Sequence, residues 1–267
     1  VGIPLYFLGK KTKNSKIKVV QVGEGADELF YGYDHWNRYL KLNKFFKPFF
    51  KSTKKYSSFK NHRLNMLSNI LFNRTSFAGG ALGFNLKELD SLIEDGLPNH
   101  SDLIFYADNK WKDYFSNKNS KISKWMTLID LKIRLPELLL MRMDKLVMQS
   151  AVEARVPFLD HKLVEYVLSL PEELLIDLTN TKSLLKKVAL KYLPDQIINR
   201  KKQGFRAPIG EWIKKDEEKF YESVQQFNSL VNLFNERELN HILNGNDYQK
   251  KWYLINLSNW HLARVAN

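Results

Sequence analysis

Glycines and carboxylates with the spacing of a ligand-binding turn follow a β-branched run near the start of the chain. The run IKVVQV, residues 17–22, leads directly into Gly23, Glu24 and Gly25, with Asp27 two residues further on. Glycines let a backbone approach a phosphate closely, and carboxylates can hold Mg²⁺ or accept a proton. Taken alone, the pattern fits an ordinary turn with helix-capping acids better than a ligand site.

A second segment, residues 135–167, carries charged residues among apolar ones. Because an unpaired buried charge is costly, we expect several of these charges to be partly buried and ion-paired. We interpret most of the pairs as contacts that hold helices together, not as reacting groups. The charged residues are Arg142, Asp144, Lys145, Glu153, Arg155 and Asp160.

A third segment, NRKKQGFRAPIGEW, covers residues 199–212 and places consecutive cations before Gly204. A positive loop can stabilise the charge that develops on a phosphoryl group during its transfer. The same composition also fits a solvated basic loop without a ligand.

A strand and a helix must position the first of these segments. Residues 17–22 predict a strand that ends at Gly23. The next residues begin a helix with Asp27 and Glu28 in its first turn, where carboxylates suit the helix dipole. A lone strand cannot satisfy its backbone hydrogen-bonding groups. If the strand is parallel and buried, most of its neighbours lie upstream of Val1, so the sequence indicates a truncated domain.

Helical patterns dominate the rest of the chain. Residues 4–13 predict a short helix. Asp160 can cap a helix with one apolar stripe, and Thr181 likewise precedes a helix with apolar side chains on one side. Residues 199–208 are predicted to form an irregular loop, and the chain beyond them is predicted to be helical.

Composition excludes several kinds of site. The 267 residues contain no cysteine, which excludes disulfides, thiolate zinc sites and cysteine nucleophiles within them. The six histidines are scattered, with no pair at a metal-ligand spacing on one helix face. No apolar run approaches the ~20 residues that span a bilayer, and the first residues do not resemble a secretory signal. We therefore expect a cytoplasmic protein with no membrane partner.

The net charge of +13 suits polyanionic partners such as nucleic acid. The densest basic and aromatic cluster runs from Lys44 to Lys60 and could form a nucleic-acid surface. Lysines are nevertheless spread along the whole chain, as in a general compositional bias. A partly buried helix followed by a solvated loop explains the cluster better.

Together, the three segments resemble the synthetase domain of glutamine-dependent asparagine synthetases, within the ATP-pyrophosphatase group. GEGADELF, then EARVPFLDHKLVEYV with LPEEL, and then RKKQGF with APIGEW occur in that family's order and at about its spacings. The resemblance covers about residues 4–213 and leaves 214–267 as a helical tail. It implies an α/β fold with part of a parallel sheet of the adenine-nucleotide-hydrolase type. Residues 1–267 would be the C-terminal, predominantly helical part of that domain.

The resemblance also implies a reaction and roles for individual residues. The side-chain carboxylate of aspartate attacks the α-phosphate of ATP, and ammonia from glutamine converts the resulting β-aspartyl-adenylate into asparagine and AMP. Asp27 is expected to ligate the Mg²⁺ that holds pyrophosphate, and Glu24 to assist proton removal from ammonia. Lys202 is expected to neutralise charge at the α-phosphate and on pyrophosphate. Gly23 and Gly25 would let the backbone pass close to the nucleotide.

The sequence departs from this family's pattern in several places. Val22 stands where the family usually has Ser, and Tyr31 stands where it usually has Gly. The SGGxDS pyrophosphate loop, the adenine pocket and the N-terminal glutaminase domain are not in these residues. We therefore expect the 267 residues by themselves to be inactive, with the missing domain as a partner, and a homodimer remains open.

Two alternative hypotheses remain. A related amidotransferase could act on another carboxylate, such as a sugar acid, or close a lactam ring. A basic helical module could instead bind nucleic acid without catalysis. Glu24, Asp27 and Lys202 together argue against the second alternative, since a binding module has no need of them.

Overall fold

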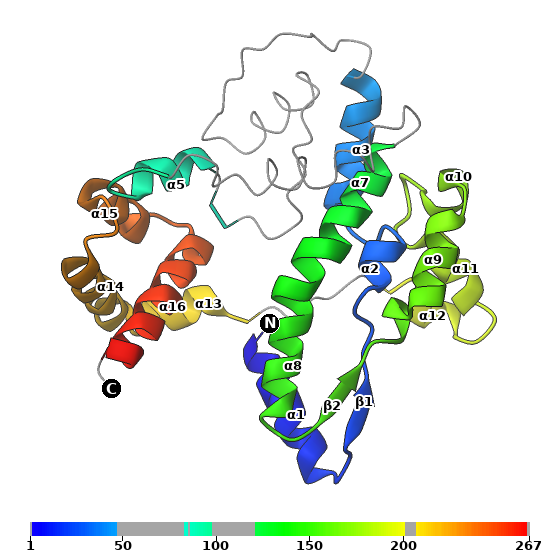
Figure 1. Cartoon of the computed structure of the whole chain (residues 1–267), viewed down its shortest axis with the longest axis horizontal. Coiled ribbons are helices and arrows are strands. Elements are labelled where there is room, and N and C mark those ends of the chain that lie inside the picture. The colour runs from blue at the N-terminus through cyan, green and yellow to red at the C-terminus, as the bar shows by residue number, and fades with distance from the viewer. Residues whose placement is uncertain (1, 47–82, 85, 98–120, 201–206, 266–267) are drawn as a thin grey trace. The chain divides into compact units, whose positions relative to one another are not determined.

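The computed structural model describes residues 2–46, 83–84, 86–97, 121–200 and 207–265 (Figure 1). Lys202 and most of the cluster from Lys44 to Lys60 lie outside these residues, so the predictions for them stay predictions. The chain divides into two compact units. The first contains the described residues up to 46 and from 121 to 207, and the second contains 83–84, 86–97 and 208–265.

A short parallel sheet lies in the first unit. Strand β1 (Val19–Gln21) pairs with β2 (Glu153–Arg155), with Val20 opposite Ala154. The ladder extends by one bond beyond β1, because the Val22 N–H donates to the Arg155 carbonyl at 2.9 Å. The predicted strand over 17–22 is therefore confirmed in position, although the paired part is shorter. Its neighbour β2 was not predicted, and it lies within the chain.

The strand β2 was missed because it offers almost no strand signal. It has three residues, and the two outer ones are exposed charged side chains. A backbone that pairs with β1 is the only feature that makes this stretch a strand. The further neighbours that we expected upstream of Val1 remain a prediction.

Helices α1 (Gly2–Asn14) and α8 (Met141–Met148) pack against each other beside the sheet. Leu5, Met143 and Val147 form their shared core. The helix predicted for residues 4–13 is confirmed as α1. Gly9 lets the two backbones approach, since a Cβ there would lie 3.3 Å from the Val147 Cα.

Helix α8 continues two preceding elements without a break, α7 (Ile122–Ile129) and η2 (Asp130–Leu140), which form one rod in Figure 1. η2 is a π-helix that contains Pro136, and the N–H of Met141 bonds back to the Pro136 carbonyl five residues earlier. Proline has no N–H to donate within a helix. Wide turns of this kind are rare and occur often at functional sites.

The remaining elements of the first unit are short helices. Asp160 caps α9 as predicted, because its side chain accepts the N–H groups of Lys162 and Leu163. Thr181 precedes α11, as predicted, but the residue directly before the helix is Lys182, which has a left-handed conformation. These elements are α2 (Ala26–Leu29), α3 (Asp34–Phe46), η3 (Pro157–Leu159), α9 (His161–Ser169), α10 (Glu172–Leu175), α11 (Ser183–Ala189) and α12 (Asp195–Ile198).

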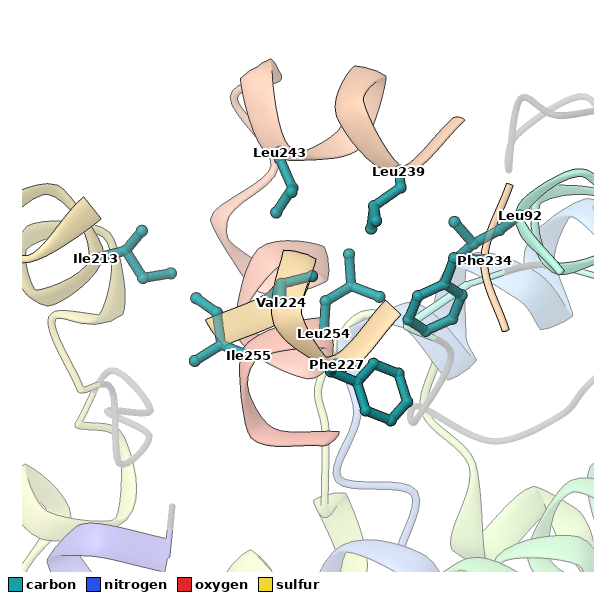
Figure 2. Close-up of a cluster of buried hydrophobic side chains, with 9 residues drawn as sticks. All are labelled: Leu92, Ile213, Val224, Phe227, Phe234, Leu239, Leu243, Leu254 and Ile255. Carbon is teal, nitrogen blue, oxygen red and sulfur yellow. The ribbon is translucent and has the colours of Figure 1, made fainter. Parts of the chain in front are cut away.

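The second unit is helical in its described residues and has its own core. Its helices are α5 (Leu86–Leu92), α13 (Ile209–Lys215), α14 (Glu217–Val231), α15 (Glu236–Asn244) and α16 (Tyr248–Val265). The core side chains in Figure 2 come from all of these helices and from the short connection between α14 and α15. The residues described above as a helical tail thus contribute three helices to this unit.

We predicted that several charged side chains of residues 135–167 would be partly buried, and this prediction was wrong. Most of the charged side chains in this segment are exposed, and only Arg142 is half-buried. Glu153 and Arg155 form a surface ion pair at 2.8 Å. Apolar neighbours in the sequence do not bury a charge that faces away from the core. The charged side chains that are buried, or nearly so, lie elsewhere and were not predicted: Glu28, Asp130, Arg134 and Lys251.

The predicted fold class is confirmed, because helices dominate the described residues and a small parallel sheet joins them. None of the described helices is long and apolar enough to cross a membrane.

Candidate active site

The turn after β1 is built tightly against the segment that follows β2. Gly25 has a φ of +92°, a conformation that side chains rarely adopt. A Cβ at this position would also lie 2.7 Å from the Leu159 Cγ. The ring of Phe158 meets Phe30 edge-on, with centroids 6.2 Å apart. The VPFLD motif, residues 156–160, therefore packs against the turn that carries Glu24. This contact explains why two motifs that are distant in sequence occur in the same chain.

Gly23 differs from Gly25. It is exposed, and a Cβ on it would meet no described atom within 4 Å. The sterics of the described residues thus require glycine at position 25 but not at position 23. Close approach to a nucleotide remains the predicted reason for Gly23.

Glu24 is half-buried on this turn. Burial is the main cause that raises the pKa of Glu24, and the negative charges of Glu28 and Asp27 raise it further. The guanidinium groups of Arg142 and Arg134 act in the opposite direction. Glu24 is therefore a stronger base than an ordinary surface glutamate, although two arginines lie near enough to lower its pKa in part.

Asp27 lies in the first turn of α2, and its carboxylate forms an ion pair with Lys182. The Lys182 Nζ lies 3.0 Å from Asp27 Oδ1, and both side chains are about a quarter exposed, at 26% and 23%. Gly32 closes this contact from the other side, since a Cβ on it would lie 2.8 Å from the Asp27 Cγ. Its N–H also donates to the Asp27 carbonyl at 2.8 Å. Lys182 thus contacts a predicted site residue, and the sequence alone did not predict this contact.

Glu28, the next residue, faces the interior and is only 1% exposed. The Tyr33 hydroxyl donates to Glu28 Oε1 at 2.6 Å, and Arg134 Nη1 lies 3.7 Å from the same oxygen. Arg134 Nη1 also pairs with Asp130 Oδ2 at 2.8 Å, and its guanidinium covers the Tyr33 ring. Two acids that are adjacent in sequence therefore have different environments.

The departures from the family pattern have structural explanations. Tyr31 has a φ of +55°, the left-handed region in which glycine is favoured, so the usual glycine suits this position. Its ring is 4% exposed and packs edge-on against Trp36, which offsets the strain. Val22 packs against the core between α1 and α8, so its side chain serves that core.

A metal ion at this site would depend on substrate oxygens. No cluster of three or more His, Cys, Asp or Glu side chains that could hold an ion occurs among the described residues. Mg²⁺ is usually held by one or two carboxylates together with substrate phosphates and waters. Asp27, at the surface beside β1, fits that kind of shared coordination and not an all-protein cage.

The structure brings Gly23, Glu24, Gly25 and Asp27 together on one turn and helix, and Lys202 lies outside the described residues. Comparison with known protein families matches residues 1–262 to the asparagine synthase family. The chain belongs to this family. The comparison with solved structures gives no match.

Relatives within the asparagine synthase family support this assignment. Asparagine synthetase [glutamine-hydrolyzing] 1 of Bacillus subtilis is 30% identical over 84% of this chain and 36% of its own length. A putative glutamine-hydrolyzing asparagine synthetase of Mycobacterium bovis is 29% identical over 99% of the chain and 42% of its own length. The chain therefore spans about two-fifths of the length of these relatives.

Proposed function

We propose that this chain forms part of the synthetase site of an ATP-dependent enzyme that converts aspartate into asparagine with ammonia from glutamine. The observation that carries the proposal is the position of Glu24 and Asp27, directly after the carboxyl end of β1 in a member of the asparagine synthase family. Open α/β sheets bind their ligands at the carboxyl ends of their strands.

The first step activates the acceptor. A side-chain carboxylate oxygen of aspartate attacks the α-phosphorus of ATP, and the bond from that phosphorus to the bridging oxygen breaks. The electron pair leaves with pyrophosphate, and the product is the β-aspartyl-adenylate. Mg²⁺ shared between Asp27 and the phosphates would neutralise the charge that develops on the leaving group. Lys202, by its resemblance to the family's loop lysine, would supply a second positive charge.

The second step forms the amide. The nitrogen of ammonia attacks the acyl carbon of the adenylate, and the carbon–oxygen bond to AMP breaks. The nitrogen must lose a proton during this step, and Glu24 would accept it. Its raised pKa brings its basicity closer to neutral pH, which favours proton transfer. The amide step should therefore slow as the pH falls through the raised pKa of Glu24.

The test is carboxylate-dependent exchange of labelled pyrophosphate into ATP by the protein expressed from its complete reading frame. We expect exchange with aspartate, and asparagine and AMP as products when ammonia or glutamine is added. We expect no exchange from residues 1–267 expressed alone. Exchange with a sugar acid, or a lactam as product, would overturn the acceptor but retain the adenylate chemistry. If no carboxylate supports exchange and tRNA or duplex DNA binds with strong salt dependence, the nucleic-acid hypothesis would replace ours.

A further inference from the structure

We propose that Arg134 is a positioning residue of this site, which fixes the orientation of α2 through Glu28 and thereby sets where Asp27 faces. The inference deepens the proposed function and rests on its assignment of Asp27 to the metal-bound phosphates. Arg134 lies in the π-helix η2, far from the site in sequence.

The Arg134 guanidinium lies between two buried acids. Its Nη1 lies 2.8 Å from Asp130 Oδ2 and 3.7 Å from Glu28 Oε1, and its Cζ lies 4.8 Å from the centre of the Tyr33 ring. The Arg134 side chain is 13% exposed, and the two acids are at most 1% exposed. A single cation therefore joins one buried carboxylate of η2 to one buried carboxylate of α2.

Helix α2 is too short to fix its own orientation. It has four residues, a single turn, and isolated helices of that length are not stable. Its buried residues Ala26, Glu28 and Leu29 hold it in place. Among these three side chains, only that of Glu28 is polar, and the Tyr33 hydroxyl and the Arg134 guanidinium meet at the same Glu28 oxygen.

The direction of Glu28 also sets the direction of Asp27, because the two are neighbours on one helix. Consecutive side chains on a helix point about 100° apart, because 3.6 residues complete each turn. When Glu28 is anchored toward η2, Asp27 must lie on the flank of α2, where it meets Lys182 and Gly32. A rotation of α2 that released Glu28 would move the Asp27 carboxylate through the same angle.

Arginine suits this position better than lysine would. Its planar fork presents several N–H donors in fixed directions, whereas an ammonium is a compact point charge. Two carboxylates on different elements can therefore be served by one guanidinium. Removal of a cation from a buried pair leaves an uncompensated charge, so the acids it served would reorient or take up protons.

The experiment compares Arg134→Met and Arg134→Lys with wild type in the protein expressed from its complete reading frame. The control is Arg155→Met, which removes an exposed arginine from β2. The first readout is calorimetric binding of pyrophosphate with Mn²⁺, and the second is pyrophosphate exchange. Loss of a group that orients a metal ligand costs about 10- to 100-fold in affinity or activity. We expect that loss for Arg134→Met in both readouts, a smaller loss for Arg134→Lys, and less than a twofold change for the control.

A purely structural role would lower the melting temperature without changing the binding of Mn²⁺ and pyrophosphate by the folded protein. If both Arg134 variants bind pyrophosphate and Mn²⁺ like the Arg155→Met control, the inference is wrong. If Arg134→Met does not fold, Arg134→Lys and Tyr33→Phe decide, because both weaken the hold on Glu28 and retain bulk. We expect at least threefold weaker binding from each, and unchanged binding from both would refute the positioning role.

The two proposals fail in different ways. If wild type exchanges pyrophosphate and the Arg134 variants bind and exchange it equally well, only the positioning role is refuted. Wild-type protein without carboxylate-dependent exchange, but with metal–pyrophosphate binding that falls in the Arg134 variants, would refute the proposed acceptor chemistry alone.

Discussion

Replacement of Lys182 by Met tests whether Asp27 receives a metal ion. In the structure, the Lys182 ammonium lies 3.0 Å from Asp27 Oδ1. A divalent cation that binds Asp27 must compete with this ammonium. Methionine keeps an unbranched apolar stem but removes the charge. We therefore expect Lys182→Met to bind Mn²⁺ more tightly than wild type in the absence of nucleotide.

The size of this effect follows from the distance and the exposure. Coulomb's law at 3.0 Å gives roughly 1.4 kcal/mol in water and about 5.5 kcal/mol at an effective dielectric constant of about 20. Both side chains are about a quarter exposed, and exposed ion pairs contribute only about 0.2 to 1 kcal/mol after solvation and entropy. A net value of about 1 kcal/mol corresponds to roughly fivefold tighter Mn²⁺ binding.

The assay is a titration of Mn²⁺ followed by electron paramagnetic resonance, with and without pyrophosphate. Lys250→Met provides a matched control, because Lys250 pairs with Glu88 at 2.7 Å with side chains 21% and 22% exposed. That pair lies in the second unit, away from the Gly23–Asp27 turn in sequence. It should not change Mn²⁺ binding.

The pyrophosphate arm should show the opposite sign. Once a metal ion takes the Asp27 carboxylate, the Lys182 ammonium needs another anionic partner, and pyrophosphate is the nearest in the proposed reaction. Lys182→Met should therefore weaken pyrophosphate binding while it tightens Mn²⁺ binding. Equal or weaker Mn²⁺ binding by this variant without pyrophosphate would refute the assignment of Asp27 as the metal ligand.

Three further predictions follow from other residues. Burial raises the pKa of Asp130 to about 6, from 3.8, so the folded protein holds this proton more tightly than the unfolded chain. Wild type should thus lose about 3 kcal/mol of unfolding free energy relative to Asp130→Asn as the pH rises from about 4 to 7, measured by urea titration. A difference in unfolding free energy between the two proteins that does not change with pH would contradict this. Tyr31→Gly should relieve about 1–2 kcal/mol of backbone strain but lose about 3–5 kcal/mol from the buried ring. We expect a net destabilisation of about 2 kcal/mol in thermal unfolding. A more stable variant would show that the strain is the larger effect. Lys202→Ala should lower exchange turnover about 100- to 1000-fold with little change in the Michaelis constant, while Lys201→Ala should not; equal losses in both would remove the specific role of Lys202.

Local sequence signals predicted the parts of the site that local interactions determine. The β-branched run before Gly23 predicted β1, and the acids after it predicted the start of α2. Asp160 predicted the start of α9, because a capping side chain bonds to N–H groups only two and three residues away. The Asp160 cap lies entirely within a few residues, and the β-branched run and the helix-start acids act through local backbone preferences, so the sequence contains these signals even where the pairing partner is distant.

Contacts between distant segments could not be predicted in this way. The pairing of β2 with β1 depends on residues more than a hundred positions apart. Lys182 looked like one more surface lysine in a lysine-rich chain, and only the fold brings it to Asp27. Lys182 also has a left-handed conformation directly before α11, but this feature is visible only in the structure and not in the sequence.

The adjacent acids Asp27 and Glu28 show why residue type alone does not assign a role. Both lie in the first turn of α2, and both suit its dipole equally well. The fold gives Asp27 a partly exposed position beside Lys182, and it buries Glu28 against Tyr33 and Arg134. An exposed acid can exchange its cation for a metal ion, whereas a buried acid held by two donors cannot do so without loss of structure. Under the proposed function, the same turn of helix would provide one residue for the ligand and one for its own orientation.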